Sequence, residues 1–111
     1  MMYGFSQHRR QMLDAELQRM AEEMPPLGAL RLAVTGDFAL GRAGVDTQLE
    51  LVVVQETEEP YRRREEFWVT HLRPRVGTRF MVFTPEEFEE LSDSDPVLAR
   101  AERTGEVIFG A

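Results

Sequence analysis

Apolar residues near the start of the chain recur with the spacing of an α-helix. Four of them fall on one face of such a helix: Leu13, Leu17, Met20 and Met24. The pattern predicts an amphipathic helix over 6–24, with Ser6 as its N-cap and the prolines at 25 and 26 as its stop. A methionine-rich face can also serve as an adaptable binding surface, but we favour packing against a sheet.

Two strands are expected next, separated by a turn. Alternating apolar and polar residues over 30–34 predict a strand with one buried face. The almost continuous apolar run over 49–54 predicts a strand that is covered on both faces. Between them, residues 36–41 begin and end with glycine and are expected to turn the chain through one helical turn. A third strand is expected over 79–83.

A charged helix is expected between Pro60 and Pro74. Its inward face should carry Tyr61, Arg64, Phe67 or Trp68, and Leu72. Its outer face has charges at i,i+4 spacing, which predicts three weak ion pairs: Glu58–Arg62, Glu59–Arg63 and Arg62–Glu66. We interpret this charge run as a solvated face and Trp68 as a core residue.

The last part of the chain has clear helix starts. Thr84 is expected to cap a short helix over 85–91, with proline at its first position and Glu87 completing a capping box. Asp95 precedes Pro96 and should open a final helix that ends near Arg103. The apolar tail over 107–109 is either an edge strand or a docked segment.

Together these elements predict an α/β (α+β) fold, in which helices cover a small mixed sheet of three or more strands. The 111 residues suit a single domain, 1–111, with one modest core. The chain has no cysteine, so disulfides and thiolate metal sites are excluded. Its net charge of −7 disfavours nucleic acid as a partner. No apolar run is long enough for a membrane span or a signal peptide, so we expect a cytoplasmic protein without membrane contact.

The segment from Arg31 to Gln55 reads as strand, glycine-bounded turn and strand, with a carboxylate where the second strand begins. This layout resembles the core of a minimal nucleotidyltransferase domain of the DNA polymerase β-like superfamily. That family has a Gly-Ser turn and then Asp-x-Asp at the start of a hydrophobic strand. Here the turn reads Gly36-Asp37 and the pair reads Gln48-Leu49-Glu50. The position of the third carboxylate, in the strand before the Thr-Pro-Glu-Glu-Phe helix start, falls on Arg79.

The resemblance implies a set of site residues. In active members, three carboxylates hold two magnesium ions that bind the nucleotide triphosphate. On this chain the residual catalytic carboxylate is Glu50, and Gln48 with Glu50 marks the vestigial metal position. Asp46 is a possible substitute ligand. The implied nucleotide-binding positions are Gly36, Asp37, Arg42 and Arg79.

Replacement of the first and third carboxylates implies impaired catalysis, which leaves open whether the chain is an enzyme. We expect a protein-binding, antitoxin-like module without a cofactor, whose partner is a helical HEPN-type protein or a second copy. One alternative is an active enzyme that uses Mg²⁺ and ATP to adenylylate a protein partner, with Asp46 or Asp37 assisting Glu50. Another is a regulatory domain that binds nucleotide without metal through Arg42 and Arg79. We favour a simpler role for Arg79, an ion pair with Glu50 across adjacent strands.

Overall fold

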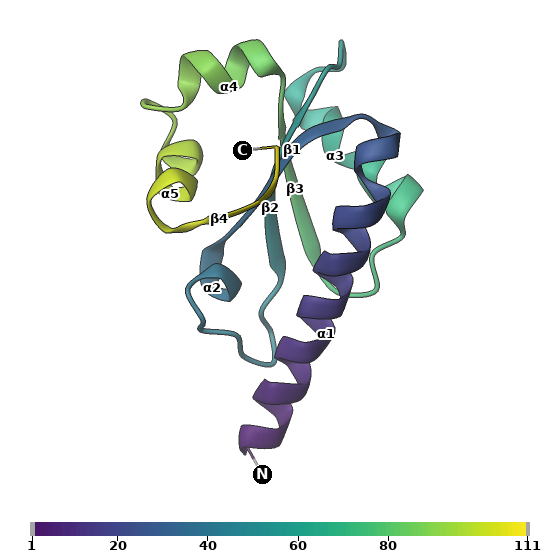
Figure 1. Ribbon diagram of the computed structural model, residues 1–111, viewed down its shortest axis with the longest axis vertical. Helices are drawn as coiled ribbons and strands as arrows, with labels where there is room; N and C mark the ends of the chain where they lie inside the picture. Colours follow the sequence, from purple (N-terminus) through teal and green to yellow (C-terminus); the bar gives the residue numbers. More distant parts are fainter. Residues whose placement is uncertain (1, 111) are drawn as a thin grey trace.

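The computed structural model describes the backbone of residues 2–110 and the side chains of residues 7–110. Its elements follow in the order α1 (Met2–Glu23), a 3₁₀ turn η1 (Pro25–Leu27), β1 (Ala29–Thr35), α2 (Gly36–Ala39), β2 (Leu49–Gln55), α3 (Tyr61–Leu72), β3 (Thr78–Phe83), α4 (Pro85–Leu91), α5 (Pro96–Thr104) and β4 (Glu106–Phe109). Figure 1 shows the strands as one sheet with helices around it. The predicted fold class, a small mixed sheet covered by helices, is confirmed.

The sheet has the strand order β3-β2-β1-β4. β1 is antiparallel to both β2 and β4, whereas β2 and β3 are parallel. A parallel pair needs a crossover connection, and α3 supplies it between β2 and β3. β2 is central, and Leu51, Val52 and Val53 are all 0% exposed. The prediction of a strand covered on both faces is therefore confirmed.

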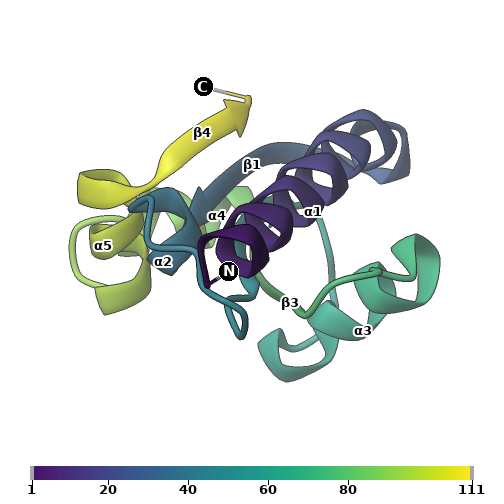
Figure 2. The same ribbon diagram turned by 90° about the horizontal axis from the view of Figure 1, so that it is seen from below.

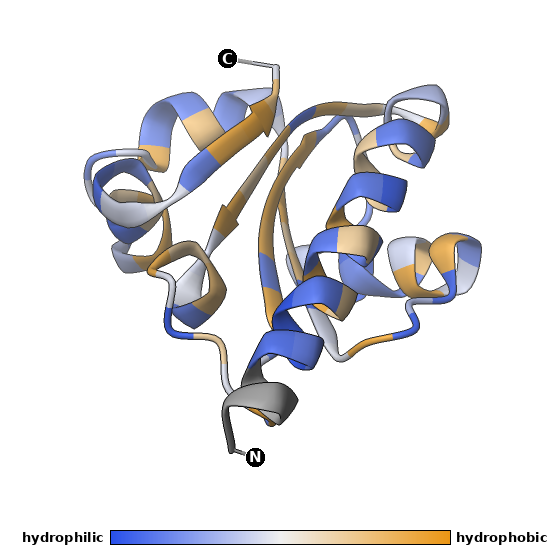
Figure 3. Ribbon diagram, turned by 60° about the horizontal axis from the view of Figure 1, so that its bottom comes forward, coloured by the Kyte–Doolittle hydropathy of each residue, from blue (hydrophilic) through white to orange (hydrophobic). Residues whose placement is uncertain are grey.

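One face of the sheet is covered by α1 and α3, which Figure 2 shows on the same side. The four apolar residues predicted for this helix are buried there, together with Trp68 and Leu72 of α3, although Met24 lies just beyond the end of α1. The methionines at 20 and 24 are fully buried, so this part of the methionine stripe belongs to the core. Figure 3 shows the contrast between the apolar strands and the polar outer side of α1.

The opposite face is covered by α4 and α5. Ala33 of β1 and Val52 of β2 form a second, smaller core cluster with Phe83 and Leu98. Side chains alternate between the two faces along a strand, so the residues two positions away from Ala33 and Val52 also face α4 and α5. This face therefore includes Thr35 and Glu50, which matters for the candidate site.

Two boundaries of the first elements differ from the prediction. α1 begins at Met2 rather than at a Ser6 cap, and the side chain of Ser6 lies outside the described side chains. In β1 the register shifts between Ala29 and Arg31, so Leu30 is an extra residue in the strand. Leu30 is 53% exposed, and the prediction that it shares the buried face of the strand is wrong because the bulge turns it outward.

The inward face of α3 is mostly as predicted. Arg64, Trp68 and Leu72 are buried, but Tyr61 is half exposed because it is the first residue of the helix and covers the ring of Phe83 from outside. The three predicted i,i+4 pairs are wrong: none of them is among the salt bridges of the described side chains. Long exposed side chains gain little from such pairs, so they do not hold one geometry.

The predicted helix starts near the C-terminal end of the chain are confirmed. Thr84 and Glu87 form a reciprocal capping box at α4, and Asp95 accepts hydrogen bonds from two backbone amides of α5. The apolar tail pairs with β1 as the edge strand β4, which settles the two alternatives for this segment. Within residues 2–110, no helix combines the length and the apolar character that a bilayer crossing requires.

Candidate functional site

The turn between β1 and α2 is built around Gly36, at the position implied for nucleotide binding. Gly36 has φ of +79°, a left-handed conformation that glycine adopts without strain. A Cβ atom at this position would lie 1.9 Å from Oε2 of Glu50. The carboxylate of Glu50 therefore packs directly against the backbone of the turn.

Three residues form a row across the sheet at the same level. Thr35 of β1 lies opposite Glu50 of β2, and Glu50 is in turn the register partner of Arg79 in β3. All three positions share the face covered by α4 and α5 by strand alternation. Two of the positions that the resemblance assigns to one site, Glu50 and Arg79, are thus adjacent, and Thr35 extends the row on the other side of Glu50. The row carries a hydroxyl, one carboxylate and a guanidinium.

Arg79 does not pair with Glu50 as expected. Its Nε lies 3.3 Å from Oε2 of Glu65 in α3, and its side chain is 64% exposed. The same carboxylate oxygen accepts a hydrogen bond from the backbone amide of Phe80. β3 is an edge strand, so Arg79 can reach around it to the helix. The prediction of an Arg79–Glu50 pair is wrong, and an exposed pair of this kind stabilises the fold by at most about 1 kcal/mol.

The remaining predicted positions surround the turn. Gln48 lies against the backbone of Gly77, where a Cβ atom would be 2.9 Å from its Cγ. Asp37, Arg42 and Asp46 are exposed, and a backbone hydrogen bond from Arg42 to Asp37 closes the turn. These three side chains extend into solvent, whereas Glu50 lies packed against the turn.

The loop that carries these residues is held by α1. The guanidinium of Arg9 donates two hydrogen bonds to the carbonyl oxygen of Thr47, at 3.1 and 2.7 Å. The Thr47 hydroxyl accepts a hydrogen bond from the amide of Gly44. This anchor was not predicted, because no spacing pattern in the sequence connects Arg9 with Thr47. The loop therefore has a fixed path in which Asp46 remains on the outside.

The described side chains offer no evident metal centre. No group of three or more histidine, cysteine, aspartate or glutamate residues among them is arranged to hold a metal ion. Of the implied ligands, Glu50 supplies the only carboxylate within the row on the sheet, because Gln48 is neutral and Arg79 is cationic. Two divalent ions ordinarily require several oxygen ligands with negative charge. The arrangement does not fit two magnesium ions.

Thr35 is a site residue that the sequence analysis missed. It is 4% exposed, and its Oγ1 has no hydrogen-bond partner within the described part of the protein. A buried hydroxyl normally finds a partner, so this one retains the capacity to bind a water molecule or a polar group of a ligand. The signal that could have identified it is its position directly before the turn glycine, in register with Glu50.

The carboxyl groups with clearly lowered pKa lie away from this row. A side-chain hydrogen bond from Arg19 lowers the pKa of Glu16, and one from Arg64 lowers the pKa of Glu87. Both carboxylates also accept backbone amide hydrogen bonds, from Arg75 and Thr84 respectively. Glu16 connects α1 to the loop before β3, and Glu87 connects α4 to α3, so the role of both carboxylates is structural.

Several groups near the turn can take part in hydrogen bonds. They are the packed carboxylate of Glu50, the hydroxyl of Thr35 and the exposed guanidinium groups of Arg42 and Arg79. Comparison with protein-family models, with curated proteins and with solved structures finds no match to this chain.

Proposed function

We propose that this chain is a nucleotidyltransferase-like domain that has lost catalysis and acts as a protein-binding, antitoxin-like module in the cytoplasm. The proposal rests on the sequence resemblance together with one observation. The row Thr35–Glu50–Arg79 places a hydroxyl and a guanidinium on either side of a single carboxylate. A site for two magnesium ions would need carboxylates at positions that this chain gives to other groups.

The geometry disfavours the active-enzyme alternative. It requires Asp46 or Asp37 to join Glu50 around one ion. Both aspartates are exposed, and no cluster of three ligands forms among the described side chains. The binding role proposed instead needs no metal and no cofactor. By the resemblance, its partner is a helical HEPN-type protein or a second copy of the chain.

One specific observation favours metal-free nucleotide binding as a second candidate. Arg79 is directed toward Glu65 and is largely exposed, so it is not neutralised by Glu50. Arg42 is also exposed at the turn. Arginine side chains are good phosphate ligands, so Arg42 and Arg79 are the groups on which this candidate depends. The carboxylate of Glu50 beside Gly36 opposes an anion at the same place, and for that reason we rank this candidate second.

Isothermal titration of ATP, with and without magnesium, tests the proposal. We expect no magnesium-dependent binding by the wild-type chain. We expect a gain of such binding in the Gln48→Asp/Arg79→Asp variant, which places carboxylates at the two positions where the resemblance expects metal ligands. Arg79→Gln is the matched control, because it removes the contact with Glu65 without adding a ligand. Tight binding by the wild type only with magnesium would contradict the proposal. Equal binding with and without magnesium would favour the metal-free candidate.

A further inference from the structure

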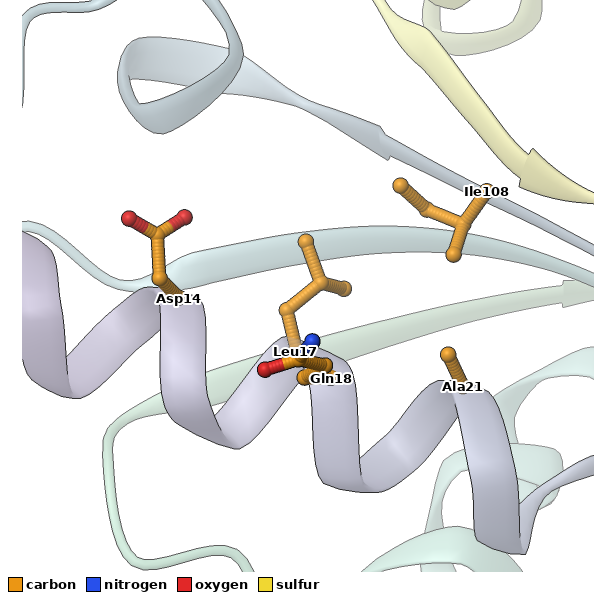
Figure 4. Close-up of a pocket in the computed structure, with 5 residues that line it drawn as sticks. All are labelled: Asp14, Leu17, Gln18, Ala21 and Ile108. Carbon is orange, nitrogen blue, oxygen red and sulfur yellow. The ribbon is translucent and has the colours of Figure 1, made fainter.

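A groove runs between α1 and β4 on the side of the sheet that α1 covers. Its volume is about 360 Å³, and it is lined by Asp14, Leu17, Gln18, Ala21 and Ile108. Figure 4 shows the four α1 residues along one side and Ile108 on the strand opposite. Leu17 and Ile108 give the groove an apolar interior, whereas Asp14 and Gln18 are exposed at its rim.

The two edges of the sheet differ in how they are covered. At β3 the amide of Phe80 donates to the Glu65 carboxylate, and the carbonyl of Val82 accepts from Arg64, so side chains occupy that edge. At β4, no side chain among those described forms a hydrogen bond with the backbone of residues 106–109. β4 has an apolar sequence, and Val107 is 39% exposed. An apolar edge without such protection is open to an added strand.

The charge around the groove is negative. Glu106 lies opposite Val34, a residue of the core under α1, so its side chain is on the α1 side of the sheet. Asp14 is on the α1 side of the same groove, and neither carboxylate forms a salt bridge among the described side chains. Arg10, one turn before Asp14, is directed toward Gly41 in the loop after α2 instead. The rim is therefore acidic and not neutralised.

We propose that β4 and this groove bind an extended partner segment that adds a strand to β4. Its apolar side chains occupy the groove beside Leu17 and Ile108, and its lysine or arginine side chains lie near Asp14 and Glu106. This inference rests on the proposed binding function and specifies the surface and the chemistry of the partner. A second copy of the chain fits less well. β4 has only four residues, and two copies that each carry a charge of −7 repel one another, whereas stable dimers bury about 1,200–2,000 Å².

The test uses defined peptides and fluorescence anisotropy. Side chains two positions apart in a strand share a face, so in one labelled peptide every second residue is threonine, and the positions between are valine in the middle and lysine at both ends. A second peptide has glutamate in place of lysine. We expect the basic peptide alone to bind, and Asp14→Lys/Glu106→Lys to weaken its binding by about tenfold or more. The control variant Glu58→Lys/Glu59→Lys makes the same change in net charge on the loop before α3 and should weaken binding less than about threefold. Equal weakening in both variants, or no binding by the wild type, would overturn the proposal.

A second measurement checks the strand addition itself. Titration of the basic peptide into ¹⁵N-labelled wild-type protein should shift the amide signals of residues 106–109 and slow their hydrogen exchange. Shifts confined to the acidic loop 56–59 would overturn the proposed surface. These results are independent of ATP binding. If the peptide does not bind and ATP binding does not depend on magnesium, only the proposed binding surface is rejected. If ATP binding depends on magnesium, the proposed function is rejected, whether or not the peptide binds.

Discussion

Replacement of Trp68 by alanine is expected to lower the free energy of unfolding by about 3–5 kcal/mol, a large part of the stability of a domain of this size. Trp68 is 0% exposed and lies between α3 and the sheet, where its ring is 6.5 Å from that of Phe80. Its indole nitrogen donates a hydrogen bond to the side chain of Gln55. The truncation leaves a large cavity and removes the donor for Gln55. Urea denaturation followed by circular dichroism measures the effect.

Two controls identify the cause of the Trp68 effect. Trp68→Phe retains most of the apolar volume and should cost clearly less than the alanine variant. Val69→Ala changes the neighbouring residue, which is 44% exposed, and should alter stability by no more than about 0.5 kcal/mol. A Trp68→Ala variant as stable as Val69→Ala would contradict the position of Trp68 in the core.

Replacement of Arg64 by methionine is expected to cost about 3 kcal/mol. The guanidinium of Arg64 is 7% exposed and donates to the carbonyls of Glu59 and Val82 and to both carboxylate oxygens of Glu87. It thereby connects α3, the β3 edge and the start of α4. Methionine fills a similar volume but removes the donor to both carbonyls and to Oε2 of Glu87, whereas Oε1 of Glu87 keeps its hydrogen bond from the Thr84 amide. Urea denaturation of the variant and of the wild type gives the difference.

The conservative variant Arg64→Lys separates charge from geometry. Lysine retains the charge but cannot donate to three partners in the same planar arrangement, so we expect it to recover less than half of the loss. The effect should also depend on pH. Arg64 lowers the pKa of Glu87 in the folded state, so the contribution of this pair is complete above the ordinary carboxyl pKa and is lost as the pH falls below it. A variant with wild-type stability at neutral pH would contradict this role.

Local signals in the sequence predicted most of the fold. The capping box at Thr84, the proline helix starts and the apolar run of β2 each depend on residues close together in the chain, so they could be recognised without the structure. The errors come from contacts between distant residues. The bulge at Leu30 depends on pairing with β2, and the partner of Arg79 depends on where α3 lies beside β3. The spacing of residues along the sequence does not indicate either of these contacts.

In the candidate site, too, relations between nearby residues were easier to predict than contacts between distant ones. The structure places Gly36 beside Glu50 and puts Glu50 in register with Arg79, three positions that the resemblance assigns to one site. The resemblance did not indicate the unpartnered hydroxyl of Thr35. The acidic groove beside β4 was also missed, since it is formed by α1 and the last strand, which are far apart in the sequence.

The central claim is that the row on the sheet does not bind a divalent ion. Titration of Mn²⁺ into ¹⁵N-labelled wild-type protein, with and without ATP, tests it most directly, because the ion broadens the NMR signals of nearby amides. The acidic loop 56–59 serves as a reference for weak binding to the surface. We expect the amide signals of Gly36 and Glu50 to broaden no more than those of this loop. Selective broadening of Gly36 and Glu50 at low Mn²⁺ would contradict it and make Glu50 a working metal ligand.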